Sequence, residues 1–564
     1  MYYKSLFPDL PKIPESNVHH FLLGRPEQRN WPDYTLFVNV ATGQRVSFRE
    51  FVERVRDGAT ALGGLGLCPE NGELVGILSE NCPDYIALIH SLLVITVPFA
   101  LFSCYSTPHE FKHANSLAQA TRIFTSPSLL SLALTSGLPP DRIYLLEGEN
   151  KGHTSYDQLV SSTRKNKIPR LPVRHATKDT LAYLVYSSGT SGPPKAVMIS
   201  HGNITSATLT IKINGEEASK VQVPPVLDTP EGLPVFFSVL PAYHSLGLCW
   251  TAFFNFLKPL TIIILPKWNI DAFFDNIPKY RVTSVTLIPS LIIQLMQHPR
   301  WKTADLSSIK GLACAASHLP LQLAEQLLAR FPAVERLPQG YGLSEFTIGV
   351  SLKPFPGMLN GRAKWKSDSV GMLLPGVEAC IIRPDGSLAG PNEAGEIYVR
   401  GGTAALGYKG NEKATRETFV DGWVRTGDQI RIDEDGVLFF EERIKDTLKI
   451  SGLQVSPVEI EDTLHVHPEK LITDVSVAGV FGGRTSDERI PRAWVVLSPA
   501  GVALGEKEVV ARLHAWVQER LSRYKWLRGG IGIVDAIPRS PTGKPLRRVL
   551  VEEYERELNA NAKL

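Results

Sequence analysis

The sequence predicts an α/β fold in which a large N-terminal domain of layered α/β subdomains includes a β-barrel-like subdomain, and a smaller α+β domain follows. Strand-like runs at residues 181–186, 260–265 and 282–288 alternate with amphipathic stretches such as residues 321–331. This alternation is typical of helices packed on a sheet. Between about residues 370 and 440 the pattern changes to short alternating strands and tight turns, which predicts the β-rich subdomain.

Two segments support the predicted β-rich subdomain and the predicted C-terminal α+β domain. In residues 395–401, Ile397 and Val399 alternate with polar neighbours, as in a half-buried strand. Further on, the helical period places five apolar side chains on one face, namely Val509, Leu513, Trp516, Val517 and Leu521. We therefore expect a large domain over residues 1–442, a hinge at residues 443–446 and a small C-terminal domain over residues 447–564.

Length and composition exclude several classes of protein. At roughly 150 residues per domain, 564 residues exceed any single small binding module. The 60 Lys and Arg against 57 Asp and Glu leave a net charge of +3, which is no evidence for or against a nucleic-acid partner. We expect no nucleic-acid partner. The six cysteines include no C-x-x-C pair, which indicates a reducing compartment, and the first residues lack the pattern of a secretory signal.

The most apolar segment, residues 85–102, approaches the length of a membrane span. His90 interrupts it and Pro98 breaks helical continuity. We expect a buried helix followed by a buried strand, and no transmembrane segment.

A loop of small residues follows the strand at residues 181–186 and predicts a phosphate-binding site. It comprises Ser187, Ser188, Gly189, Thr190, Ser191, Gly192, Pro193, Pro194 and Lys195. Hydroxyl groups, unobstructed backbone N–H groups and a closing lysine can surround phosphate oxygens. The spacing differs from that of a Walker A loop, and its composition alone fits an ordinary surface loop equally well.

The amino-acid sequence of this loop closely resembles that of the signature loop of the adenylate-forming enzymes, a superfamily that includes acyl-CoA synthetases. Five further motifs of that superfamily follow in its order: Leu240-Pro-Ala-Tyr-His244-Ser-Leu-Gly, Gln339-Gly-Tyr341-Gly-Leu-Ser344-Glu345, Gly422-Trp-Val-Arg-Thr-Gly-Asp428, Arg443-Ile-Lys445-Asp446 and Ile537-Pro-Arg-Ser-Pro-Thr-Gly543-Lys544. The chain is thereby identified as a member, with ATP, Mg²⁺ and coenzyme A as the expected cofactor and co-substrates.

The resemblance assigns a role to each motif residue in the activation of a carboxylic acid. Lys544 bridges the acid and the α-phosphate, where negative charge develops and fixed cations stabilise it. Glu345 offers the hard oxygen that Mg²⁺ prefers, beside the Ser344 hydroxyl. The adenosine contacts fall on Gly340, Tyr341, Asp428 and Arg443.

The small domain and the acid pocket are assigned in the same way. Lys449 and Gln454 resemble the thioester-forming stretch of 4-coumarate:CoA-ligase-like enzymes, and Lys445 is the expected pivot of a mobile small domain. His244 is placed at the mouth of the acid pocket. The remaining expected pocket residues are Leu246, Trp250, Ala315, Gly340, Phe346 and Ile348.

Two histidine motifs invite a metal-site interpretation that we reject. Residues 109–113 satisfy H-E-x-x-H, in which two histidines on one helical face bind zinc. Thr107 and Pro108 instead predict the start of a structural helix. His465 and His467 fit a helix that ends before Pro468.

The expected function is an acyl- or aryl-CoA ligase acting on a small-molecule carboxylic acid. Tyr243, His244 and Ser245 stand where peptide-synthetase adenylation domains carry an aspartate for an α-amine, which favours a plain acid. The alternatives are an enzyme that loads a carrier-protein phosphopantetheine and a catalytically inactive acyl-binding homologue. The terminal Ala562-Lys563-Leu564 resembles the S-K-L address, so we expect recognition by the peroxisomal import receptor and a peroxisomal, otherwise cytoplasmic, location.

Overall fold

The computed structural model describes residues 1–187, 194–315, 319–347, 349–443, 448–450, 453–481, 489–521, 523–540 and 543–561. At residues 442, 443, 449, 450, 453, 454, 524 and 559–561 it describes the backbone alone.

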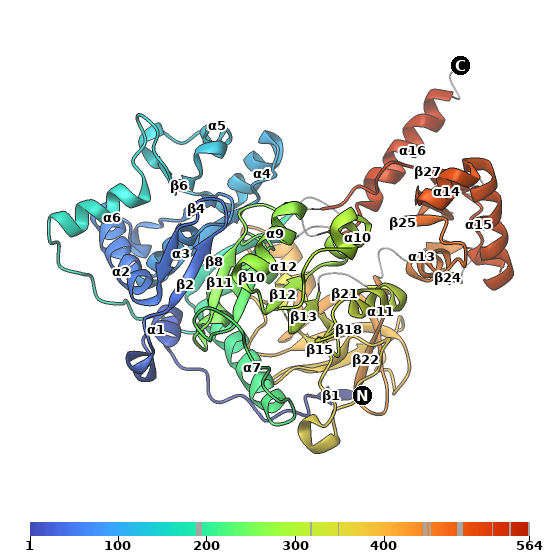
Figure 1. Cartoon of the computed structure of the whole chain (residues 1–564), viewed down its shortest axis with the longest axis horizontal. Helices are drawn as coiled ribbons and strands as arrows, with labels where there is room; N and C mark the ends of the chain where they lie inside the picture. Colours follow the sequence, from blue (N-terminus) through green and yellow to red (C-terminus); the bar gives the residue numbers. More distant parts are fainter. Residues whose placement is uncertain are drawn as a thin grey trace.

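Two largely parallel sheets form the centre of the large domain (Figure 1). The seven-stranded sheet has the order β19 (Gly407–Tyr408), β9 (Lys195–Ser200), β8 (Leu181–Ser187), β5 (Phe99–Phe102), β4 (Val75–Leu78), β6 (Arg122–Thr125) and β7 (Ile143–Leu145). The six-stranded sheet has the order β13 (Gly311–Cys314), β12 (Ser284–Leu287), β10 (Val235–Ser238), β11 (Thr261–Ile264), β2 (Thr35–Asn39) and β3 (Arg45–Ser47).

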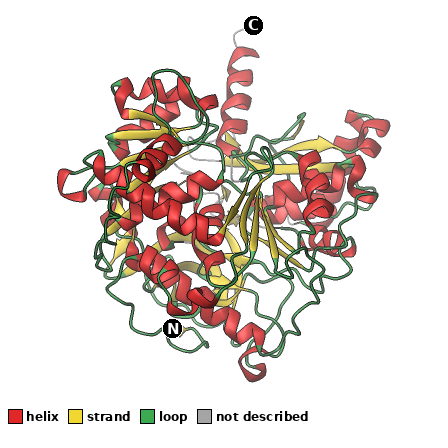
Figure 2. Ribbon diagram, turned by 60° about the vertical axis from the view of Figure 1, so that its left-hand side comes forward, coloured by secondary structure: helices red, strands yellow, loops and turns green. Residues whose placement is uncertain are grey.

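Helices cover these sheets in layers (Figure 2). Those of the large domain are α1 (Val18–Leu23), α2 (Phe48–Gly64), α3 (Pro83–Val94), α4 (Pro108–Ala118), α5 (Leu130–Ala133), α6 (Tyr156–Lys165), α7 (His201–Ser219), α8 (Ser245–Leu248), α9 (Ile270–Tyr280), α10 (Pro289–Gln297), α11 (Leu321–Ala329) and α12 (Glu412–Thr418). Helix α3 is buried along almost its whole length, because its side chains share one core with both sheets.

The β-rich subdomain is a nine-stranded antiparallel sheet that extends beyond the predicted range of 370–440. It has the order β1 (Tyr2–Lys4), β17 (Glu378–Ile382), β18 (Gly395–Arg400), β21 (Trp423–Ile432), β22 (Val437–Arg443), β16 (Gly371–Leu373), β15 (Ser351–Leu352) and β14 (Gly340–Tyr341), with β20 (Phe419–Val420) paired to β21. In β18, Ile397 and Val399 are buried in its core as predicted. The added strands carry Tyr341 to the sheet edge that faces the candidate site.

The C-terminal unit has its own core. It contains the hairpin of β23 (Leu448–Ile450) and β24 (Leu453–Val455), and the sheet of β25 (Ile472–Phe481), β26 (Arg489–Leu497) and β27 (Ile531–Ile533). Its helices are α13 (Pro457–His465), α14 (Pro499–Leu504), α15 (Glu506–Arg520) and α16 (Arg547–Asn561). Helix α16 projects away from the body of the protein in both Figure 1 and Figure 2.

Several predicted elements are confirmed with small shifts. The segment 85–102 divides into α3 and β5, and in the described ranges no helix has the length and apolar character needed to cross a membrane. The predicted helix over 509–521 is α15, but Leu521 lies just beyond its end and Trp516 is only half-buried, donating a hydrogen bond to the Thr463 carbonyl at 2.7 Å. The H-E-x-x-H segment forms α4, and the Glu110 carboxylate accepts hydrogen bonds from Thr107 at its start.

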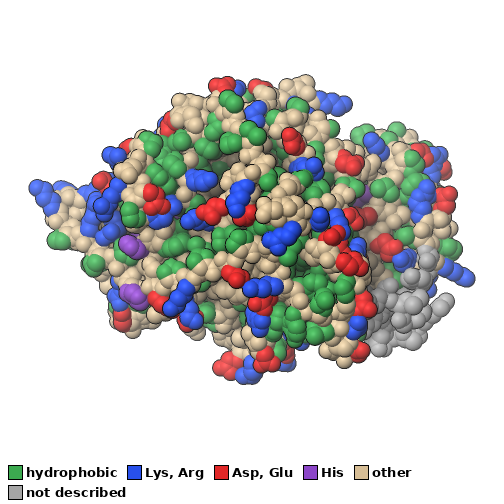
Figure 3. Space-filling model, turned by 90° about the horizontal axis from the view of Figure 1, so that it is seen from below, with side chains coloured by type: hydrophobic (Ala, Val, Ile, Leu, Met, Phe, Trp, Pro, Cys, Tyr) green, Lys and Arg blue, Asp and Glu red, His purple; other side chains and the backbone are tan. Residues whose placement is uncertain are grey.

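Charged side chains of both signs are interspersed on the face of the molecule that Figure 3 shows. This distribution accords with the near-balance of 60 basic and 57 acidic residues.

Candidate active site

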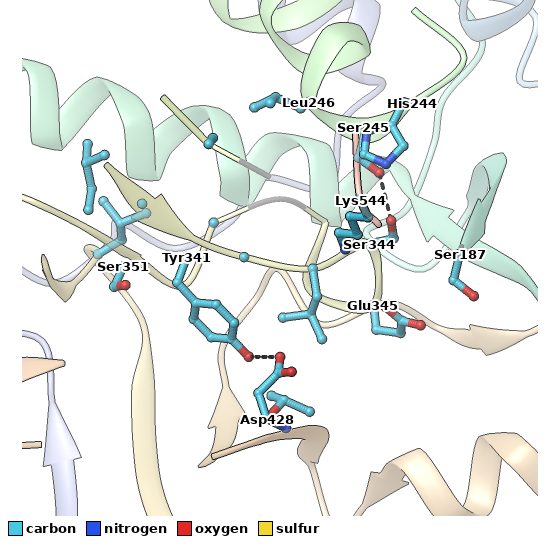
Figure 4. Close-up of a pocket in the computed structure, with 18 of the residues that line it drawn as sticks. Ser187, His244, Ser245, Leu246, Tyr341, Ser344, Glu345, Ser351, Asp428 and Lys544 are labelled. Carbon is cyan, nitrogen blue, oxygen red and sulfur yellow. Dashed lines mark hydrogen bonds between the residues drawn. The ribbon is translucent and has the colours of Figure 1, made fainter. Parts of the chain in front are cut away.

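A cavity of about 580 Å³ lies where the seven-stranded sheet, the six-stranded sheet, the β-rich subdomain and the C-terminal unit meet. It brings together predicted residues from five separate motifs (Figure 4). Those that line it are Ser187, Lys195, His244, Leu246, Trp250, Ala315, Gly340, Tyr341, Ser344, Glu345, Asp428 and Lys544. These predicted residues therefore place two lysines, two carboxylates and several hydroxyl groups around a single space.

The glycine-rich loop joins two paired strands. Ser187 ends β8 and pairs with Lys195, the first residue of β9, and both side chains reach the cavity. The loop residues predicted to bind phosphate between them, Ser188, Gly189, Thr190, Ser191 and Gly192, lie outside the described residues.

Tyr341 and Asp428 meet at the end of the cavity formed by the β-rich subdomain. The Tyr341 hydroxyl donates to the Asp428 carboxylate at 2.7 Å, and Asp428 is only 1% exposed (Figure 4). Asp428 pairs with Arg443 across the ladder of β21 and β22, and Arg443 is described by its backbone alone. Gly340 precedes this aromatic residue because a side chain there would approach the Ser351 carbonyl to 2.8 Å.

Ser344 and Glu345 lie on a short 3₁₀ turn, Ser344–Phe346, that packs against β8. The Ser245 hydroxyl donates to the Ser344 hydroxyl at 3.2 Å, and the Tyr408 hydroxyl donates to Glu345 at 2.9 Å. A carboxylate beside hydroxyl oxygens is the hard donor set that suits Mg²⁺, which commonly takes one protein carboxylate together with substrate phosphates. These residues therefore fit the expected cation.

One residue of this turn, Phe346, was predicted to line the acid pocket, and that prediction is wrong. Phe346 is fully buried in the core of the β-rich subdomain and does not line the cavity. The 3₁₀ turn directs successive side chains in different directions, so Glu345 reaches the cavity while Phe346 packs inward. Ile348 lies outside the described residues.

His244 and Lys544 face each other at the acid end of the cavity (Figure 4). Burial, and to a smaller extent the nearby Lys544 ammonium, lowers the pKa of His244 to about 3. His244 is therefore neutral at physiological pH and can donate or accept a hydrogen bond without adding charge.

A π-helical turn forms the apolar wall beyond His244. Helix α8 continues into the π-helix Cys249–Phe253, which presents Trp250 to the cavity together with Phe254. The two rings are 5.5 Å apart and almost perpendicular, and the buried His90 Nε2 donates to the Ala252 carbonyl at 2.8 Å. Such turns recur at functional sites because they redirect side chains.

The turn that carries Lys544 is fixed on both sides by arginine–carboxylate pairs. Arg539 contacts both Asp474 oxygens, at 2.7 and 2.8 Å, and donates to the Gly543 carbonyl at 2.9 Å. On the other side Arg547 contacts both oxygens of buried Glu461, at 2.8 and 3.0 Å. Gly543 has φ +80° and lies so close to the large domain that a Cβ there would be 2.4 Å from the Ser290 hydroxyl.

The residues predicted for the second reaction lie on the β23–β24 hairpin of the C-terminal unit. Lys449 pairs with Gln454 across the β23–β24 hairpin, and both are described by backbone alone. The predicted pivot, Lys445, lies outside the described residues. A second cavity of about 360 Å³ between the two domains shares Gly340, Tyr341 and Lys544 with the first.

Several residues that line the cavity were not predicted from the sequence. Tyr408 reaches the site because β19 pairs with β9, and Thr286 and Cys314 because β12 and β13 are neighbours. No local signal marks them, since each depends on pairing between distant segments.

The comparisons with known proteins agree with this geometry. The sequence model of the family described as "AMP-binding enzyme" matches residues 25–409. The chain is 31% identical to "Probable 4-coumarate--CoA ligase 3" of Dictyostelium discoideum over 97% of both chains. It is also 31% identical to "Probable CoA ligase CCL5" of Humulus lupulus, over 92% of this chain and 89% of that protein.

A solved structure shares the fold. The anthranilate CoA ligase AuaEII in complex with anthranoyl-AMP superposes with a TM-score of 0.80 over 97% of this chain and 99% of that one, at 23% identity.

Proposed function

Because the chain belongs to the AMP-binding enzyme family and its relatives include 4-coumarate–CoA and acyl-CoA ligases, we propose that it converts a carboxylic acid to its coenzyme A thioester. The observation that carries this proposal is the single cavity that holds Lys195, Glu345, Asp428 and Lys544. The reaction of ATP with an acid requires cations for the phosphates, a carboxylate for Mg²⁺ and a carboxylate for the ribose within one site.

In the first step the acid is activated as an adenylate. A carboxylate oxygen attacks the α-phosphorus of ATP, the bond to the β-phosphate bridging oxygen breaks, and pyrophosphate leaves. Lys544 lies where charge develops between the two anions, and a preorganised cation there stabilises the transition state. The Asp428 carboxylate accepts hydrogen bonds from the ribose hydroxyl groups, and the Tyr341 hydroxyl fixes the orientation of that carboxylate. Glu345, beside Ser344, would hold Mg²⁺, which would supply positive charge to neutralise the phosphates.

In the second step the thiol sulfur of coenzyme A attacks the acyl carbon. The bond from that carbon to the AMP oxygen breaks, AMP leaves, and the thiol proton passes to solvent. Lys544 faces the acid end in the structure. One fixed arrangement cannot present Lys544 and also Lys449 and Gln454, which belong to the same small domain, to a single acyl-phosphate centre, so the proposal includes a turn of the C-terminal unit between the steps. Backbone rotation at Lys445 is the proposed pivot.

The acid end supports an apolar substrate. Leu246, Trp250 and Phe254 line it, and His244 remains neutral. We expect cinnamate to be accepted at least as well as 4-coumarate, because an unpaired buried phenol costs about 1 to 3 kcal/mol. A preference for 4-coumarate of more than about tenfold would contradict this expectation and would point to Thr286 as the partner of the phenol.

The decisive experiment is ATP–pyrophosphate exchange with a panel of aliphatic, aryl-alkanoic and cinnamic acids. Exchange that requires an acid separates an enzyme from an inactive acyl-binding homologue. Release of AMP that requires free coenzyme A then separates the ligase from an enzyme that loads a carrier protein. No exchange with any acid would refute the proposal.

The peroxisomal location is a separate proposal that depends on Ala562-Lys563-Leu564, which lie outside the described residues. The projection of α16 away from the body supports it, because a receptor needs room around its target (Figure 1). Removing Leu564 from an N-terminal fluorescent fusion should move the signal from peroxisomes to the cytosol. An unchanged distribution would refute the address.

A further inference from the structure

Tyr408 lies between the two groups that flank the phosphate end of the cavity. Strand β19 pairs with β9 so that Tyr408 is opposite Val197, and Lys195 lies two residues earlier on the same face of β9. The Tyr408 hydroxyl donates to Glu345 at 2.9 Å. The Lys195 ammonium lies 4.7 Å from the centre of the Tyr408 ring. One side chain therefore contacts both the expected metal-binding carboxylate and the expected phosphate-binding lysine.

The surroundings of Tyr408 hold its ring in one orientation. The side chain is only 6% exposed, and its ring packs edge-on against Phe419 with centroids 5.7 Å apart. Its backbone N–H donates to the Thr415 hydroxyl at 3.0 Å. Gly407, with φ +129°, lies so close to Thr415 that a Cβ would be 2.7 Å from its methyl group, so the approach of this strand depends on glycine.

The two contacts of Tyr408 are made by different parts of its side chain. The Tyr408 hydroxyl is the donor in its hydrogen bond to Glu345, because an ionised carboxylate can only accept. The electron-rich face of the ring attracts the Lys195 ammonium independently of that hydroxyl. The two contacts can therefore be removed separately, the first by phenylalanine and both by leucine.

We propose that Tyr408 is a positioning residue for pyrophosphate departure: its hydroxyl orients the Glu345 carboxylate toward the cation and its ring holds Lys195 at the phosphates. This inference rests on the proposed function and adds a residue to it. Fixing both groups before ATP binds lowers the reorganisation needed during the reaction.

The test measures metal and nucleotide binding directly. Mn²⁺ affinity is measured by water-proton relaxation with wild type, Tyr408→Phe and Tyr408→Leu, each in the presence of α,β-methylene-ATP. Loss of a hydrogen bond to a charged group predicts Mn²⁺ binding about tenfold weaker in both variants. Affinity for the analogue without metal should stay within about twofold in Tyr408→Phe and fall about three- to tenfold in Tyr408→Leu.

Tyr156→Phe provides the matched control. Tyr156 is also buried and its hydroxyl hydrogen-bonds to the Ser91 hydroxyl at 2.8 Å, remote from the cavity. This variant should bind metal and analogue like wild type. If it weakens metal binding as much as Tyr408→Phe does, the effect reflects lost stability and the inference is wrong.

Acid-dependent exchange supplies an independent readout. Raising Mg²⁺ should restore the exchange rate of Tyr408→Phe, because the carboxylate is still present, but should restore that of Glu345→Ala far less. Unchanged Mn²⁺ affinity in Tyr408→Phe overturns the inference while leaving the proposed function intact. Wild type that binds Mn²⁺ and the analogue but shows no exchange with any acid overturns the proposed function instead.

Discussion

Replacing Trp250 by alanine should shift the preferred acid toward longer chains. Trp250 belongs to the π-helical turn, faces the cavity and packs against Phe254 and Phe236, with ring centroids 5.5 and 6.2 Å away. Truncation removes about nine heavy atoms from the wall of a cavity of about 580 Å³. The wall relaxes partly around such a gap, so we expect room for about three additional methylene groups.

The magnitude follows from the burial of these groups. Each methylene contributes about 0.8 kcal/mol when it leaves water for an apolar site, so three contribute about 2.4 kcal/mol. The ratio of kcat/KM for an acid three methylenes longer to that for the preferred wild-type acid should therefore rise about 60-fold. The assay is acid-dependent pyrophosphate exchange across a homologous series of acids.

The control is Trp423→Ala. Trp423 lies on β21 beneath the Arg400 guanidinium and does not line the cavity, so its loss should leave the chain-length preference unchanged. If Trp250→Ala lowers kcat/KM equally for every acid, the indole supports the fold and does not limit substrate length. An unchanged ratio would refute the placement of the acid against this wall.

Three further predictions concern the lysine, the pivot and the stability of the fold. Lys544→Ala should slow pyrophosphate exchange about 10²- to 10³-fold, yet supplied acyl-AMP should still be converted to thioester at close to the wild-type rate; equal loss of both reactions would show a general role in folding. Lys445→Pro fixes φ near −65° and should lower coenzyme A-dependent turnover about 100-fold or more while adenylation survives; wild-type rates in both steps would show that the pivot is elsewhere. Burial lowers the pKa of His90 to about 4, so below pH 6.5 the unfolded chain takes up the proton first, and His90 alone lowers the free energy of unfolding by about 2 kcal/mol on going from pH 7 to pH 5. His90→Gln keeps a donor for Ala252 without that proton, so the fall in its free energy of unfolding between pH 7 and pH 5, measured with urea, should be about 2 kcal/mol smaller than that of wild type; an identical fall would assign the pH dependence to other groups.

Residues within continuous motifs could be placed from the sequence, whereas residues brought in by pairing between distant strands could not. Tyr341, Glu345 and Asp428 belong to contiguous motifs, and all three border the cavity. Tyr408 enters only because β19 joins β9, a pairing between residues 197 and 408 that no local pattern records. Phe346 was placed wrongly because its neighbour Glu345 faces the cavity and a 3₁₀ turn reverses direction within one residue.

The fold shows the same division between local and distant information. Alternation in residues 395–401 was sufficient to predict β18 and its buried face. The contribution of Tyr2–Lys4 to the β-rich sheet was not foreseeable, because β1 pairs with β17 across more than 370 residues of chain. Helical periodicity likewise gives no sign of the π-turn at Cys249–Phe253, whose position depends on packing around it.

Because of that π-turn, the wall of the acid pocket can be altered by deletion of a residue as well as by substitution. A π-turn holds one residue more than an α-helical turn, so deleting a single residue from Cys249–Phe253 would restore a regular helix and rotate the residues on one side by about 100° relative to those on the other. Trp250 and Phe254 would then no longer meet over the cavity. One in-frame codon loss could thus replace the wall of the pocket in a single evolutionary event, while the nucleotide-binding strands kept their register.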